Sequence, residues 1–135
     1  MRKGKLRKGD MILTTRGSVG NIALNIDSIQ FDNMRINSGM VIIRKNFISL
    51  DMAFLYKIFQ SNVIRAQIYR TVFGSAQPQL TVKEINRFKV SLPSKDEQIQ
   101  MVKFLDTYFK YVELCQDQLA KLMSFKQGLL QKMLI

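Results

Sequence analysis

Residues 74–100 read GSAQPQLTVKEINRFKVSLPSKDEQIQ and contain two signals for the start of a helix. Thr81 and Glu84 have the spacing of a capping box, in which each side chain bonds the other residue's backbone N–H. Ser94 and Glu97 repeat that spacing. The first box predicts a helix of one or two turns, and the second predicts the start of a much longer helix.

Residues 87–92, between the two boxes, alternate charged and apolar side chains. This period of two is typical of a strand, and Pro93 would end it because proline offers no donor to a ladder. The stretch therefore predicts a short helix, a strand and a long helix, in that order.

Residues 96–135 contain no proline and carry an imperfect heptad stripe of apolar residues. A helix of this length measures about 60 Å, too long for a body of some 95 residues to cover. We expect residues 96–135 to be a dimerisation helix that pairs antiparallel with a second copy, a direction that its early acidic side chains and late lysines permit without forcing it. The expected contact residues are Val102, Leu105, Phe109, Val112, Leu119, Leu122, Met123 and Leu130.

Residues 1–95 predict a small sheet with short helices. Residues 11–15 and 21–24 indicate a hairpin around a glycine-bearing turn, and residues 40–44 are expected to form the central strand. Residues 49–59 and 62–69 have helical spacing. In the second helix we expect Val63, Ala66 and Tyr69 to face inward. The fold class is therefore α+β, with a mixed or antiparallel sheet followed by a long C-terminal helix.

The chain is strongly basic, with 21 Lys and Arg against 10 Asp and Glu and a net charge of +11. Residues 96–135 hold five charges of each sign, so the whole surplus lies in residues 1–95. Such a surplus attracts polyanions through counterion release. Nucleic acid is the expected partner of residues 1–95, although a basic surface can also be inert.

Several chemistries are excluded by composition. The chain has no His and a single Cys, Cys115, which rules out zinc fingers, disulfide frameworks and serine–histidine or thiol–imidazole catalysis. No apolar run approaches the roughly 18 residues that span a bilayer, and the start lacks the apolar stretch of a signal peptide. We expect a cytoplasmic protein with no membrane partner and no cofactor.

Five motifs together carry a family resemblance. They are KGDMILTTRGSVG at residues 8–20, GSxQxxL at 74–80, VSLP at 90–93, EQ at 97–98 and FKQGLLQKM at 125–133. In this order the chain resembles the specificity subunit of type I restriction-modification enzymes. The resemblance implies a target recognition domain that binds double-stranded DNA, followed by a long spacer helix. It also implies that methylation and cleavage belong to partner methyltransferase and restriction subunits.

A full subunit of that family is similar to two such units in tandem, each reading one half of a split DNA site, with the long helices antiparallel and methyltransferase subunits alongside. This chain has one unit, and its hairpin begins almost at residue 1. We therefore expect residues 1–95 to be the back part of a recognition domain.

The resemblance directs the choice of DNA-contacting residues. Arg reads guanine and Asn or Gln reads adenine through paired hydrogen bonds worth about 1–3 kcal/mol each. Candidates between the motifs are Asn33, Arg35, Asn37, Arg65, Gln67, Arg70 and Ser75. Gln77, inside a motif, is either an adenine contact or a structural residue. Phosphate contacts are expected from Arg16, Arg44 and Lys45, and a solvated surface position is the alternative for each.

Two other functions fit part of the pattern. A small RNA-binding or ribosome-associated protein with a helical oligomerisation tail would share the charge, but should expose aromatic side chains on a strand for base stacking. A pure oligomerisation protein would keep the tail and leave the basic body unexplained.

Overall fold

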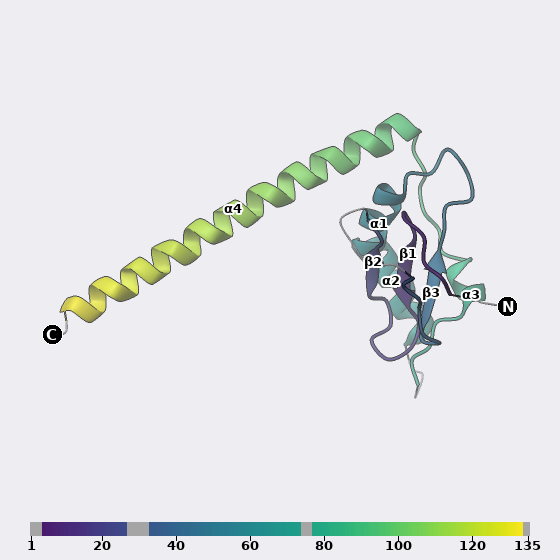
Figure 1. Ribbon diagram of the computed structural model, residues 1–135, viewed down its shortest axis with the longest axis horizontal. Helices are drawn as coiled ribbons and strands as arrows, with labels where there is room; N and C mark the ends of the chain where they lie inside the picture. Colours follow the sequence, from purple (N-terminus) through teal and green to yellow (C-terminus); the bar gives the residue numbers. More distant parts are fainter. Residues whose placement is uncertain (1–3, 27–32, 74–76, 134–135) are drawn as a thin grey trace. The chain divides into compact units, whose positions relative to one another are not determined.

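A computed structural model describes residues 4–26, 33–73 and 77–133 of the chain. Its elements in order are β1 (Met11–Thr14), β2 (Ile22–Leu24), β3 (Met40–Ile43), α1 (Met52–Gln60), α2 (Asn62–Val72), α3 (Val82–Ile85) and α4 (Lys95–Met133), as Figure 1 shows. The chain divides into two compact units, Met1–Ile99 and Gln100–Ile135. The α+β class is confirmed.

The sheet is antiparallel with the strand order β2-β1-β3. Met11 pairs with Leu24 in the expected hairpin, and β3 pairs with the other edge of β1. The expectation that β3 is central is wrong. The central strand is β1 because it buries Met11 and Leu13 completely, whereas every residue of β3 is only half-buried.

The core of the first unit forms around β1, α1, α2 and Leu80. Helix α2 contributes Ile64 and Ile68, which lie four residues apart on one face. The inward face expected from Val63, Ala66 and Tyr69 is wrong. Val63 and Tyr69 are 62% and 61% exposed and Ala66 is also exposed, because the two isoleucines fill the space against the sheet.

The prediction of a strand at residues 87–92 is also wrong: the structure describes these residues, and they do not form a strand. The side chain of Gln67 replaces a neighbouring strand. Its amide donates to the Lys89 carbonyl at 3.0 Å, and its oxygen accepts from the Lys89 N–H at 2.9 Å. Phe88 and Val90 still pack against the core, whereas Leu92, the third apolar residue of the alternation, is exposed.

Both capping boxes are present. The Thr81 backbone donates to Glu84, and the Thr81 hydroxyl accepts from the Glu84 N–H at 3.3 Å. Ser94 and Glu97 repeat the arrangement at the start of α4. Hydrogen bonds from the Thr81 backbone and hydroxyl lower the pKa of Glu84, and those from the Ser94 hydroxyl and backbone lower the pKa of Glu97.

Helix α4 continues for 39 residues, as expected. It exposes large apolar side chains along its length, among them Phe104, Tyr108, Leu119, Leu122 and Phe125. Cys115 is exposed on this helix. None of the described helices is long and apolar enough to cross a membrane.

Candidate nucleic-acid interface

Three chain segments meet at the C-terminal end of β1. The Thr15 N–H donates to the Gly39 carbonyl at 2.7 Å, and the Thr15 carbonyl accepts from the Leu80 N–H at 3.0 Å. Leu80 itself is 2% exposed. Thr15 thereby fixes the turn after β1, the turn before β3 and the segment before α3 in one place.

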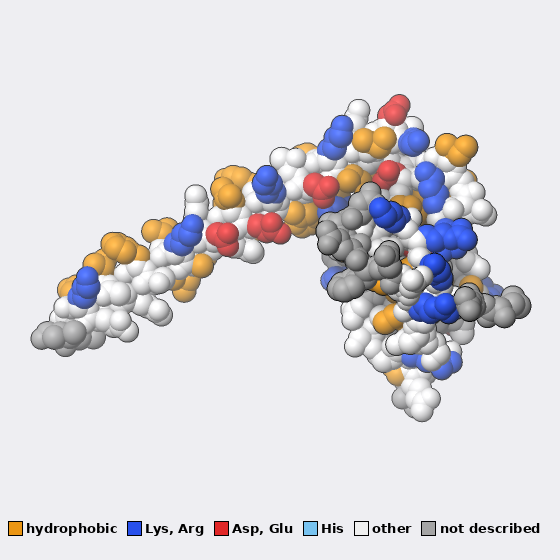
Figure 2. Space-filling view, in the orientation of Figure 1, with side chains coloured by type: hydrophobic (Ala, Val, Ile, Leu, Met, Phe, Trp, Pro, Cys, Tyr) orange, Lys and Arg blue, Asp and Glu red, His pale blue; other side chains and the backbone are white. Residues whose placement is uncertain are grey.

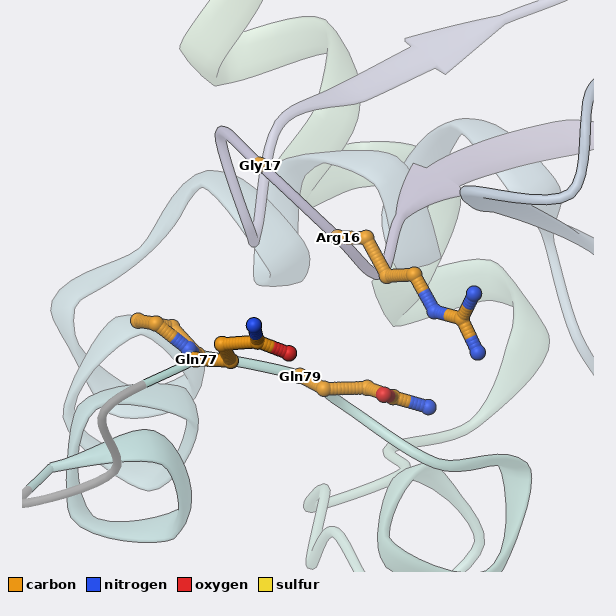
Figure 3. A pocket seen from close by; sticks show the side chains of 5 residues that line it. Arg16, Gly17, Gln77 and Gln79 are labelled. Carbon is orange, nitrogen blue, oxygen red and sulfur yellow. The ribbon is translucent and has the colours of Figure 1, made fainter.

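A pocket of about 500 Å³ opens at this junction. It is lined by Arg16, Gly17, Gln77, Pro78 and Gln79, as Figure 3 shows. Arg16 and Gln79 are directly paired in an antiparallel bridge. In Figure 3 their side chains extend in the same direction, with Gln77 set back on the segment that carries Gln79.

The turn that carries Arg16 is held by its own hydrogen bonds. The Thr14 hydroxyl accepts from the Asn21 N–H at 3.0 Å and donates to the Ser18 carbonyl, and the Gly20 N–H donates to the Thr14 carbonyl at 3.0 Å. Gly20 has φ +94° and lies against Ile68, where an added Cβ would be 3.4 Å from a side-chain carbon. A glycine is therefore required, because other residues resist that backbone angle.

The opposite end of β1 carries a different kind of site. Arg44 donates to both oxygens of Asp10 at 2.7 Å, and the Arg7 N–H donates to the same carboxylate at 2.7 Å. Burial acts to raise the pKa of Asp10, but the hydrogen bonds from Arg44 and Arg7 and their charges outweigh it and lower the pKa. Arg44 is thus an ion-pair partner within the chain, which leaves less of its charge for a phosphate.

Helix α2 presents a third group of basic residues. Arg65 and Arg70 are exposed. Arg70 lines a pocket of about 420 Å³ together with Gln67, Thr71, Glu84, Arg87 and Phe88. Both polar atoms of the Gln67 amide are engaged by Lys89, so Gln67 acts within the chain as a structural side chain.

The structure brings together only some of the candidate residues. Arg16 and Gln77 line one pocket, and Asn37 lies nearby, since its oxygen accepts from the Gly39 N–H at 2.9 Å and Gly39 lies beside Arg16. Asn33, Arg35 and Lys45 are exposed elsewhere, Asn33 with φ 62°. Ser75 lies outside the described residues.

Gln79 is the pocket residue that sequence reasoning missed. The available signal was the spacing of two residues between Gln77 and Gln79 in an extended segment around a proline, which places both on one face.

Among the described residues, no group of three or more His, Cys, Asp or Glu could hold a metal ion.

The two units differ in charge. Figure 2 shows Lys and Arg side chains gathered over the first unit on the face in view, whereas α4 carries both signs among apolar side chains. This distribution follows the sequence count, in which residues 96–135 are neutral.

The apolar stripe of α4 is open to solvent in the single chain. Phe109, Leu119, Leu122, Met123 and Leu130 are exposed, and Val102, Leu105 and Val112 are half-buried. Each such side chain stabilises an assembly by about 1.5–3 kcal/mol when it is fully buried.

A comparison with protein families identifies the class. The model of the type I restriction modification DNA specificity domain matches residues 3–124, so the chain belongs to that family. Among curated proteins, the chain is similar to the type I restriction enzyme EcoBI specificity subunit of Escherichia coli. The two are 25% identical over 135 residues, covering 97% of this chain and 28% of that protein. The chain thus spans less than a third of that relative's length.

Proposed function

We propose that this chain is a non-catalytic DNA-specificity module that binds part of a split duplex target, acting in the cytoplasm with methyltransferase and restriction subunits. Methylation and cleavage would belong to those partners. The observation that carries the proposal is the pocket at the end of β1. There an arginine and a glutamine, the side-chain types that contact phosphates and bases, are paired within residues 1–95, which hold the whole surplus of positive charge.

Helix α4 supports the partner part of the proposal because it has two apolar seams. The first repeats at alternating steps of three and four as Val102, Leu105, Phe109, Val112, Gln116, Leu119, Met123, Lys126, Leu130 and Met133. The second lies one residue earlier at each step: Met101, Phe104, Tyr108, Tyr111, Cys115, Gln118, Leu122, Phe125, Leu129 and Lys132. One residue corresponds to about 100° around a helix, so the seams face two directions.

We assign the first seam to a second copy of this chain and the second seam to a helix of the methyltransferase subunit. This assignment moves Leu122, one of the contact residues expected from the sequence, to the second seam. A single partner helix covers one seam and leaves the other exposed. Self-pairing through a two-fold axis closes the assembly, because each copy offers the same surface. An apolar groove lies between the two seams, lined by Tyr108, Tyr111 and Cys115 of the second and by Val112, Gln116 and Leu119 of the first.

The antiparallel pair has a preferred register. When the whole first seam is used, Val102 lies opposite the second copy's Met133, and Val112 lies opposite the second copy's Met123. A slide of one heptad shortens the seam and brings Glu113 of the two copies together. Since like charges in contact are destabilising, the full-length register is favoured.

An RNA-binding function is less well supported. None of the three described strands carries an aromatic residue for base stacking. Tyr69 and Phe73 are exposed near the end of α2, where their rings pack against each other at 5.0 Å.

Fluorescence anisotropy tests the proposed ligand. Labelled duplex DNA, single-stranded DNA and duplex RNA are titrated with the chain at 50 and 200 mM salt. The proposal expects tightest binding to duplex DNA, weakening steeply with salt as neutralised phosphates regain their counterions. Tighter binding to either of the other ligands would contradict it.

A further inference from the structure

The pairing of Arg16 with Gln79 fixes two polar side chains side by side. Directly opposed residues of an antiparallel pair have Cβ atoms about 4.5–5.5 Å apart and project to the same face. Figure 3 shows the guanidinium and the carboxamide extending in one direction from the two segments. Both residues are exposed at the pocket of about 500 Å³.

The backbone beneath Gln79 is held on both sides. Pro78 before it has a locked φ angle, and Leu80 after it is buried with its N–H bonded to Thr15 at 3.0 Å. A ligand that contacts Gln79 therefore orders a side chain and not a loop, which reduces the entropy lost on binding.

The side-chain amide of Gln79 has no hydrogen-bond partner among the described residues, whereas several carboxamides elsewhere in the first unit do. The amides of Gln67 and Gln98 use both of their polar atoms inside the first unit. The oxygen of Asn37 accepts from Gly39. Gln79 thus combines an available donor, an available acceptor and a place in the pocket.

These groups match two neighbouring parts of a duplex. A glutamine amide donates to N7 of adenine and accepts from its N6 amino group in the major groove, and this two-point match distinguishes adenine from the other bases. A guanidinium beside it is suited to a phosphate oxygen, which fixes position without sequence information. Successive nucleotides lie about 3.4 Å apart along a strand, a spacing that two side chains rooted about 5 Å apart can span.

We propose that Gln79 is a specificity-determining residue that contacts an adenine edge, and that Arg16 beside it holds an adjacent phosphate. This inference rests on the proposed DNA-binding function and assigns separate roles to the two paired residues. It places sequence discrimination at the end of β1.

Selection of bound sequences from a randomised duplex library tests the assignment. The wild-type chain is compared with Gln79→Ala, Gln79→Glu, Arg16→Ala and the control Gln60→Ala, an exposed residue of α1 outside the pocket. The wild type should select adenine at one position by about 5- to 150-fold. Gln79→Ala should lose that preference alone, and Gln79→Glu should move it toward cytosine, whose amino group donates to a carboxylate.

Arg16→Ala should weaken binding to all sequences similarly and lower the salt slope by about one, with the adenine preference retained. Gln60→Ala should match the wild type. The inference is overturned if Gln79→Ala selects the wild-type sequence, if Arg16→Ala is the variant that changes the selected base, or if the wild type binds duplexes without any base preference. Absence of duplex binding by the wild type would instead overturn the proposed function itself.

Discussion

Gln98 accepts a hydrogen bond from the Asp51 backbone N–H at 2.8 Å, joining the first turn of α4 to the start of α1. The same amide donates to the carbonyls of Ser49 and Pro93, each at 2.9 Å. Gln98 is fully buried, and Asp51 also caps α1 by accepting from the Phe54 N–H at 2.9 Å. One side chain therefore satisfies three backbone groups where two helices begin.

Replacing Gln98 by leucine should destabilise the first unit by about 1–3 kcal/mol, because it leaves buried backbone groups without partners. Urea unfolding followed by circular dichroism measures the loss. Gln100→Leu is the matched control, since Gln100 is exposed two residues later on the same helix. An equal effect of the two substitutions would contradict the role of Gln98.

The ion pair between Asp10 and Arg44 should make stability depend on pH. Folding lowers the pKa of Asp10 below its ordinary value of 3.8, so its contribution is present above that pH and is lost as the pH falls through the lower folded value. We expect Asp10→Asn to be less stable than the wild type at pH 7, with the difference shrinking below about pH 4. Urea midpoints across pH measure this, with Asp117→Asn on α4 as control. A difference that stays constant with pH would contradict it.

Self-association of α4 should depend on its first seam. The wild-type chain should be a dimer by light scattering at tens of micromolar, and Leu105→Glu with Leu119→Glu should be a monomer because two charges are placed on the seam in each copy. Thr107→Glu with Ser124→Glu is the control, since it adds the same charge at exposed positions away from both seams. A monomeric wild type, or a variant that remains dimeric, would show the assignment to be wrong.

Cysteine cross-linking should report the register of the pair. In a Cys115→Ala background, Val112→Cys with Met123→Cys should form intermolecular disulfides under mild oxidation, because these positions oppose each other. Phe109→Cys with Leu119→Cys should cross-link poorly, since a heptad slide of about 10 Å is needed to bring them together. Preferential cross-linking of the second pair would favour the slipped register. Disulfides in a variant that carries Val112→Cys without Met123→Cys would indicate a parallel pair.

Much of the fold was predicted by local signals in the sequence. The capping boxes at Thr81 and Ser94 work within four residues, so their outcome does not depend on distant packing. The hairpin was predictable for the same reason, as its turn needs glycines at positive φ. The length of α4 followed from the absence of proline in a periodic sequence.

Tertiary choices were not predictable in this way. Residues 87–92 have a strand pattern, but strand formation also needs a neighbouring backbone, and here Gln67 supplies the hydrogen bonds from a side chain. The buried face of α2 could not be predicted either, because both Val63 and Ile64 are apolar and only the packing against the sheet decides which of them is buried. Gln79 was missed because its pairing with Arg16 joins residues distant in sequence.

The most direct test of DNA binding by the basic unit is charge reversal in two matched sets. One variant carries Arg35→Glu, Arg65→Glu and Arg70→Glu, and the other carries Lys103→Glu, Lys110→Glu and Lys121→Glu on exposed positions of α4. Both change the net charge equally, so a difference between them reports the location of the contacts. Affinity for duplex DNA is measured by anisotropy over a range of salt concentrations. The account predicts that the first variant loses affinity and has a shallower salt dependence, because the reversals remove positive charge from the DNA-binding unit, while the second stays near the wild type. Equal losses from the two sets would contradict it.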